Sequence, residues 1–183
     1  IVRRTANDRF GIVSCGKAYY DLRSALRDLG LDDAALGAAG VRILHLGMTF
    51  PLEPRMVDEF VEGLETVLVV EEKRSFVEMQ LRELLYNRAR RPAIHGKLGP
   101  DGEELLPAHG ELDAEKVARA LGRWFGGAPG ASARLRRLDE IAAQADPAAA
   151  LPARTATYCS GCPHNRSTIV LDGQIAGGGI GCH

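Results

Sequence analysis

Short apolar runs alternate with longer amphipathic stretches between residues 9 and 85, and this alternation most constrains how the chain folds. The runs at 10–15, 41–46 and 66–70 are almost wholly apolar, which is typical of strands buried on both faces. Apolar residues recur at helical spacing in the stretches between and after them: 18–29, 56–64 and 76–85. We therefore expect an α/β fold, an open and mostly parallel sheet with helices on both faces, in which these three runs are neighbouring strands.

The remaining sequence predicts a smaller strand, two helices and a change of domain. Residues 92–98 favour a short strand, and 115–125 and 135–142 have helical apolar spacing. From 146 to 154 the composition shifts to Pro and Ala, which is typical of a semi-rigid linker. We predict three parts: an α/β domain with a helical extension at 1–146, a linker at 147–157, and the truncated start of a second domain at 158–183.

Composition narrows the function classes. A net charge of −1 gives no reason to expect nucleic acid or an acidic membrane as partner. No apolar run approaches the roughly 20 residues that a membrane-spanning helix needs. The 4 cysteines are too sparse for a secreted disulfide scaffold, which favours a reducing, cytoplasmic location. The chain begins without Met and ends abruptly at Gly181-Cys182-His183, so we expect a piece of a longer protein.

The strongest local motif is Cys159-Ser160-Gly161-Cys162, with Cys182 further along in a glycine-rich run. Two thiolates separated by two residues bind one metal or cluster well, but the spacing also fits a redox dithiol or no chemistry at all. A thioredoxin-like site is disfavoured because the motif follows a linker rather than a strand. His164 and His183 lie beside these cysteines, either as ligands or as pocket lining.

Charged residues follow two of the predicted strands. Glu71-Glu72 comes directly after the run at 66–70, and Gly16-Lys17 follows the run at 10–15. Ligands of open parallel sheets bind beyond the carboxyl ends of strands, so both pairs are candidates. The alternatives are a solvated helix entry for the glutamates and a plain surface position for Lys17. The basic run Arg88, Arg90 and Arg91 indicates a solvated face or a contact with another domain.

The order of motifs resembles one family. Residues 158–165 (Tyr-Cys-Ser-Gly-Cys-Pro-His-Asn) and 179–183 (Gly-Ile-Gly-Cys-His) look like the opening of the thiamine-diphosphate-binding domain of indolepyruvate:ferredoxin oxidoreductases. Residues 68–72 and 76–78 resemble the preceding domain of that family, which is similar to the C-terminal domain of transketolases. The Ser-Gly-Cys-Pro-His-Asn form is closer to the long fused bacterial enzymes than to the two-subunit archaeal ones.

The resemblance implies an enzyme that oxidatively decarboxylates aryl pyruvates, such as indolepyruvate, to acyl-CoA. It implies thiamine diphosphate with Mg, a 4Fe-4S cluster, coenzyme A as co-substrate and ferredoxin as electron acceptor. The remaining domains of the same enzyme and a second copy in a homo-oligomer are the other implied partners. On this reading the cluster ligands are Cys159, Cys162 and Cys182, and the residues lining the cofactor are His164, Asn165, Gly179, Ile180, Gly181 and His183.

This chain by itself is expected to be non-catalytic, because no Gly-Asp-Gly diphosphate motif and no second cluster motif is present in it. Its expected role is to pack the other domains together and to supply one edge of the cofactor pocket. The rival interpretation is a docking module with a structural zinc. A milder alternative is an oxidoreductase of the pyruvate or 2-oxoglutarate type.

Overall fold

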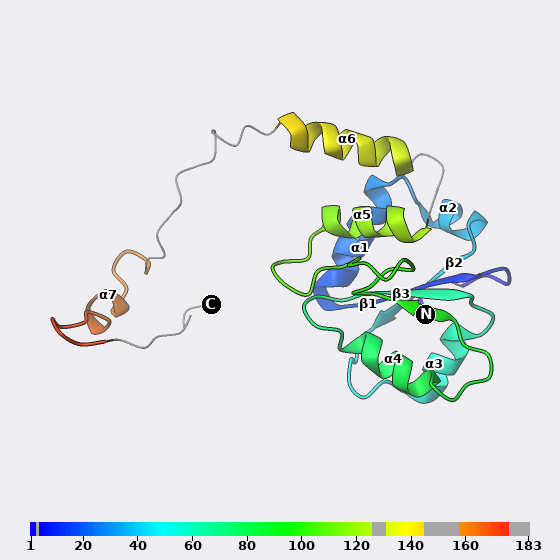
Figure 1. The fold of residues 1–183 in the computed structure, drawn as a ribbon, viewed down its shortest axis with the longest axis horizontal. Coiled ribbons are helices and arrows are strands. Elements are labelled where there is room, and N and C mark those ends of the chain that lie inside the picture. Colours follow the sequence, from blue (N-terminus) through cyan, green and yellow to red (C-terminus); the bar gives the residue numbers. More distant parts are fainter. Residues whose placement is uncertain (3, 126–130, 145–157, 176–183) are drawn as a thin grey trace. The chain divides into compact units, whose positions relative to one another are not determined.

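The computed structural model describes residues 1–2, 4–125, 131–144 and 158–175, and it divides into two units, Ile1–Gln144 and Ala145–His183. The first unit is built on a four-stranded sheet with strand order β2-β1-β3-β4, in which every pairing is parallel (Figure 1). The strands are β1 (Phe10–Cys15), β2 (Val41–Leu46), β3 (Thr66–Val70) and β4 (Ala93–His95).

The register confirms that the three apolar runs are neighbours. Val13 of β1 lies opposite Leu44 of β2 on one side and Val69 of β3 on the other. All three side chains are at most 2% exposed, as expected for a central strand and its two partners in a sheet covered on both faces. The short strand predicted at 92–98 is β4, which extends the sheet beyond β3.

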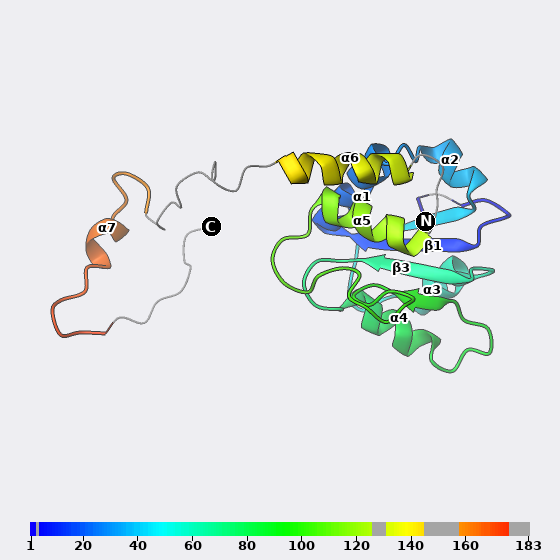
Figure 2. The ribbon, with the colours of Figure 1, turned by 45° about the horizontal axis from the view of Figure 1, so that its top comes forward.

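Helices cover both faces of the sheet, as predicted (Figure 2). Alternate side chains of each strand point to opposite faces: Ile12 and Leu68 enter one core cluster, whereas Val13 and Val69 enter the other. The first cluster packs under α1, α2 and α5, and the second under α3 and α4. These helices are α1 (Gly16–Asp28), α2 (Asp33–Ala38), α3 (Pro54–Val61), α4 (Val77–Leu85) and α5 (Ala114–Phe125).

Local chemistry accounts for where these elements start and how closely they pack. Glu53 caps α3 by accepting hydrogen bonds from the backbone amides of Arg55 and Met56, and a proline follows at the first helical position. A Cβ on Gly11 would lie 2.6 Å from a Leu64 side-chain atom, so this glycine lets α3 and its following turn approach β1. The short helix α2 was not predicted, although its Asp32 cap is visible in the sequence.

A buried ion pair ties the amino ends of the strands together. Arg42 of β2 and Asp8 lie 3.2 Å apart, with side chains only 4% and 0% exposed. The Arg42 guanidinium also donates to the backbone carbonyls of Phe60 and Glu62, and Asp8 accepts from the amide and hydroxyl of Thr5. Burial acts to raise the pKa of Asp8, but the Thr5 and Arg42 interactions outweigh it and hold the pKa below its usual value.

The last helix of the first unit, α6 (Ala131–Gln144), packs on α5. Its Leu135 and Leu138 are half-buried, and Asp139 pairs with Arg119 of α5 at 2.5 Å. Ile141 is 52% exposed, so the apolar stripe predicted for this helix is covered only over its first half. The predicted linker at 147–157 lies outside the described residues, and its form stays a prediction.

Candidate functional site

The chain reverses its direction across the sheet between β1 and β3. The connection through α1 and α2 leads from β1 to β2, and the connection through α3 returns past β1 to place β3 on its other side. In open α/β sheets, ligands bind beyond the carboxyl ends of the two strands at such a switch point. The residues that follow these strands are Gly16-Lys17 and Glu71-Glu72, so the structure brings the two candidate pairs to one place.

Glu71 is a buried helix cap. Its carboxylate accepts hydrogen bonds from the backbone amides of Phe76, Val77 and Glu78, at 3.0, 2.7 and 3.0 Å, and the residue is 4% exposed. The N-terminus of α4, which elsewhere is an anion site, is therefore occupied by a carboxylate of the same chain. One alternative for Glu71 was a solvated position at the start of a helix. The residue does stand at the start of α4, but it is buried there.

Cys15, at the end of β1, lies next to this carboxylate. Burial of the thiol raises its pKa, and the charge of Glu71 raises it further. A thiol in that environment stays protonated at neutral pH, and the thiolate is the nucleophilic form of cysteine. Cys15 is therefore a poor nucleophile despite its position at the switch point.

Lys97 reaches the same place, and nothing in the sequence marked it. Its amine donates to the backbone carbonyl of Glu71 at 2.6 Å and to that of Pro107 at 3.3 Å. Burial lowers the pKa of Lys97, against the opposing effect of Glu71, Glu78 and other nearby carboxylates. Sequence analysis missed it because the residue lies in a turn after β4, and only tertiary folding places its amine beside the end of β3.

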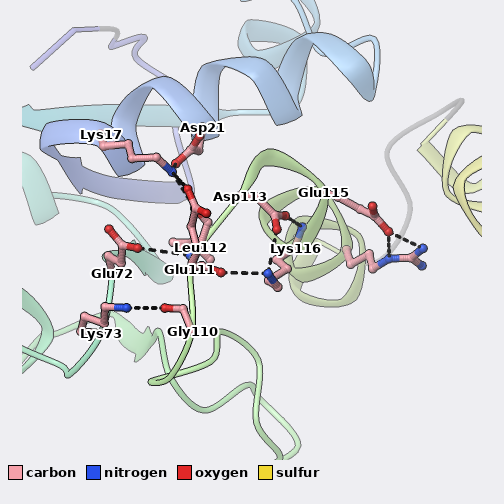
Figure 3. Close-up of polar contacts among 11 residues, drawn as sticks. Lys17, Asp21, Glu72, Lys73, Gly110, Glu111, Leu112, Asp113, Glu115 and Lys116 are labelled. Atoms are coloured by element: carbon pink, nitrogen blue, oxygen red, sulfur yellow. Dashed lines mark hydrogen bonds and ion pairs between the residues drawn. The ribbon is translucent and has the colours of Figure 1, made fainter. Parts of the chain in front are cut away.

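Residues 104–113, which we call the capping segment, pass the carboxyl ends of β1 and β3, where Gly110 and Leu112 lie beside Lys17, Glu72 and Lys73 (Figure 3). Lys17 donates to the carbonyl of Leu112 at 2.8 Å, and Lys73 donates to that of Gly110 at 2.5 Å. Glu72 accepts from the amide of Leu112 at 3.3 Å. Apolar side chains anchor the segment in the core below α1 and α5: Leu105, Leu106 and Leu112, all at most 7% exposed.

The capping segment changes what the switch point can do. The charged groups that follow β1 and β3 bind backbone atoms of the same chain, and Glu71 lies beneath them, engaged by α4. The Lys17 side chain is 53% exposed and also pairs with Asp21 and Glu111, so it lies at the surface, as one alternative predicted, and there it holds the capping segment.

The thiol motif lies in the second unit and forms a tight turn. The amide of Cys162 donates to the carbonyl of Cys159 at 3.0 Å, and Gly161 between them has a φ of +80°, which favours glycine. The Asn165 side chain also donates to the Cys159 carbonyl, at 3.0 Å, and His164 begins the short helix α7 (His164–Ser167). Cys159 is exposed and Cys162 is half-buried.

The other residues assigned to this site are not placed. Cys182, Gly179, Ile180, Gly181 and His183 lie outside the described residues, so the third thiol and the glycine approach to a cofactor stay predictions. Among the residues that the structure does describe, no three His, Cys, Asp or Glu side chains form a group suited to a metal ion. No residue is buried within 158–175.

The basic run Arg88, Arg90 and Arg91 lies at the amino ends of the strands, on the side of the sheet opposite the switch point. Arg88 pairs with Asp58 at 2.5 Å, and both line a groove of about 940 Å³ between the ends of α3 and α4. Its lining carries charges of both signs, since it includes Glu59 and Glu62 as well as Arg90 and Arg91. Both glutamates pair with Arg4, at 3.0 Å each. Within the described residues, no helix is both long enough and apolar enough to cross a membrane.

Comparison with known proteins gives this architecture a family. The family model described as "Indolepyruvate oxidoreductase domain" matches residues 1–147. The indolepyruvate oxidoreductase subunit IorA of Thermococcus kodakarensis is 31% identical over 164 residues, and that of Methanothermobacter marburgensis is 32% identical over 164 residues. These alignments cover 89% and 90% of this chain but only 23% of each relative, so the chain spans about a quarter of their length.

Among solved structures, a split gene transketolase in an inactive beta4 tetramer aligns with 69% of this chain and 41% of its own, at 18% identity and a TM-score of 0.43. The two relatives are archaeal, and the closer likeness to long fused bacterial enzymes stays a prediction. Since the family model covers the entire sheet, all five helices that flank it and α6, the chain belongs to the indolepyruvate oxidoreductase domain family.

Proposed function

We propose that this chain is a fragment of an enzyme that oxidatively decarboxylates aryl pyruvates, with indolepyruvate as the type substrate. Acyl-CoA is the product, coenzyme A the co-substrate and ferredoxin the electron acceptor. The observation that carries the proposal is the family match over residues 1–147, together with identity above 30% to two subunits named indolepyruvate oxidoreductase.

Within that enzyme, the α/β domain at 1–146 is structural rather than catalytic. The candidate groups at its switch point are engaged by the chain itself: Glu71 caps α4, and Lys17 and Lys73 hold the capping segment. The reacting groups therefore come from other domains, and this one positions them. The same geometry supports the expectation that the isolated chain is inactive.

The proposed cofactors are thiamine diphosphate with Mg and a 4Fe-4S cluster, and the thiol turn fits one part of this set. Cys159 and Cys162 flank a turn closed by a backbone hydrogen bond between them, with a glycine at positive φ inside it, and this spacing suits two ligands of one cluster. With Cys182 they would hold the cluster, while His164 and Asn165 would line the thiamine. The thiazolium supplies an electron sink for decarboxylation when it is bound.

Activity and metal content of the full-length protein test this proposal. The anaerobically purified enzyme should reduce ferredoxin with indolepyruvate and coenzyme A, and it should do so faster than with pyruvate or 2-oxoglutarate. Elemental analysis should find iron and sulfide. Zinc without iron would favour the docking module, and preference for pyruvate or 2-oxoglutarate would replace the substrate assignment while keeping the reaction type.

A further inference from the structure

Four large apolar side chains lie exposed beside the carboxyl edge of the sheet, on the loop after β2 and at the start of α4. Met48, Phe50, Phe76 and Met79 are 62%, 67%, 50% and 64% exposed, and we call them the Phe50–Phe76 patch. The two phenylalanine rings contact each other, with centroids 6.0 Å apart. Met79 is three residues after Phe76 on α4 and so shares its helical face.

The loop that carries Phe50 is held firmly against α4. The Gln80 side chain donates to the carbonyl of Thr49 at 2.9 Å and accepts from the amide of Leu52 at 3.2 Å. Leu52, at 4% exposure, is anchored in the core. Phe50 is therefore presented on a braced loop, which lowers the ordering cost of binding because the loop is already in place.

The chemistry of the patch is that of an interface core. Aromatic residues and Met are enriched at the centres of protein interfaces, and charged residues are depleted there. Residues 48–52 (Met-Thr-Phe-Pro-Leu) and 75–77 (Ser-Phe-Val) contain no charge, whereas Glu53 and Arg74 border them. The groove of about 940 Å³ is lined by residues from the ranges 58–64 and 85–92 and by none of these four, so the patch is not part of that groove.

We propose that the Phe50–Phe76 patch is the docking surface for another domain of the same polypeptide. The relatives identify this occupant, because the chain covers only 23% of their length and a domain of that share needs a surface for the remainder. The place fits, since the patch adjoins the edge at which an α/β sheet meets its ligands. The inference rests on the proposed function only in taking the domain as one part of a larger enzyme.

Oxidative footprinting of the full-length enzyme tests this assignment, with the urea-unfolded protein as reference. An uncovered Met79 would oxidise at a rate within about twofold of the unfolded one, because oxidation follows exposure. A docked domain should slow it at least about tenfold, since interface centres are desolvated. Tyr86, 72% exposed at the far end of α4, is the internal control and should stay within about twofold of its unfolded rate.

A pair of variants identifies the docking contact. Phe76→Asp places a charge in the patch and should return Met79 oxidation to within about twofold of the unfolded rate, whereas the matched Tyr86→Asp should leave Met79 protected. A Met79 rate within about twofold of its unfolded rate in the wild-type enzyme, as for Tyr86, overturns the proposal. Protection of Met79 that disappears on dilution to the monomer also overturns it, because the occupant would then be a second copy of the chain. Protection that appears only when another polypeptide is added overturns it as well.

These readouts do not depend on turnover. A protected Met79 in a protein that fails to oxidise indolepyruvate would refute the proposed substrate and leave the docking surface standing. An unprotected Met79 in an active enzyme would do the reverse.

Discussion

Glu71 and Glu72 form a matched pair of adjacent carboxylates that the structure assigns to different environments. Glu71 is 4% exposed and accepts three backbone amides at the start of α4, whereas Glu72 is half-exposed and accepts one amide, from Leu112, at 3.3 Å. Replacing each with Gln removes one charge and almost no volume. The comparison therefore isolates what the buried carboxylate contributes to stability.

The magnitude for Glu71→Gln follows from its partners. One glutamate oxygen accepts from Phe76 and Val77, and the other accepts from Glu78. The amide oxygen of Gln can replace only one of them, so its NH₂ group meets a backbone donor. An unsatisfied buried donor costs about 1–3 kcal/mol, and the lost charge at the helix N-terminus adds about 0.3–2 kcal/mol. We expect a loss of roughly 2–4 kcal/mol in the free energy of unfolding.

Urea titration followed by circular dichroism measures this difference, with Glu72→Gln as control. The control should change the free energy of unfolding by no more than about 0.5 kcal/mol, because Gln can accept the same single amide and the site is partly solvated. In the full-length enzyme, Glu71→Gln should lower the thermal midpoint of unfolding and leave kcat unchanged at temperatures where the variant is folded. Equal effects of both variants on stability, or a loss of kcat in Glu71→Gln without a loss of stability, would refute the structural role.

Three further predictions address the core, the acid response and the thiols. Val69→Asp should unfold the first unit, because an unpaired carboxylate in a central strand costs several kcal/mol against a margin of roughly 5–15 kcal/mol; a melting temperature equal to that of Val69→Ala would contradict it. Folding lowers the pKa of Asp8 from its usual 3.8, so the stability that this carboxylate contributes is present above about pH 4 and is lost as the pH falls through the folded pKa. Asp8→Asn should remove that part of the pH dependence. An unchanged plot of unfolding free energy against pH in this variant would count against the Arg42 pairing. In the full-length enzyme, Cys162→Ala should lower iron content and ferredoxin reduction while the α/β domain stays folded; full iron content in this variant would rule out the cluster assignment.

Much of the fold follows from local sequence. The apolar runs that became β1, β2 and β3 are buried on both faces, so their strand identity, their parallel pairing and the helices on both sides follow from residue pattern alone. The signals for α3 are similarly local, since Glu53 and Pro54 cap and start it. The family resemblance also came from short motifs, and its match over 1–147 confirms it.

The candidate site depended on tertiary structure. Lys17 and Leu112 are 95 positions apart, and their hydrogen bond forms where the capping segment, which leads into α5, meets the start of α1, on which α5 packs. Sequence patterns predict neither a helix nor a strand over 104–113, and the burial of Lys97 has no local signature. Apolar periodicity is set by residues close together in the sequence. The capping segment covers the switch point only because segments far apart in the sequence meet there.

The thiol motif shows both sides of this division. The sequence by itself determined which residues carry sulfur and how far apart Cys159 and Cys162 are, and the turn through Gly161 follows from that spacing. The separate roles of Glu71 and Glu72 were decided by the tertiary structure alone. Adjacent carboxylates are equivalent in a sequence, and only the packing of α4 against the end of β3 buries one of them and leaves the other to the capping segment.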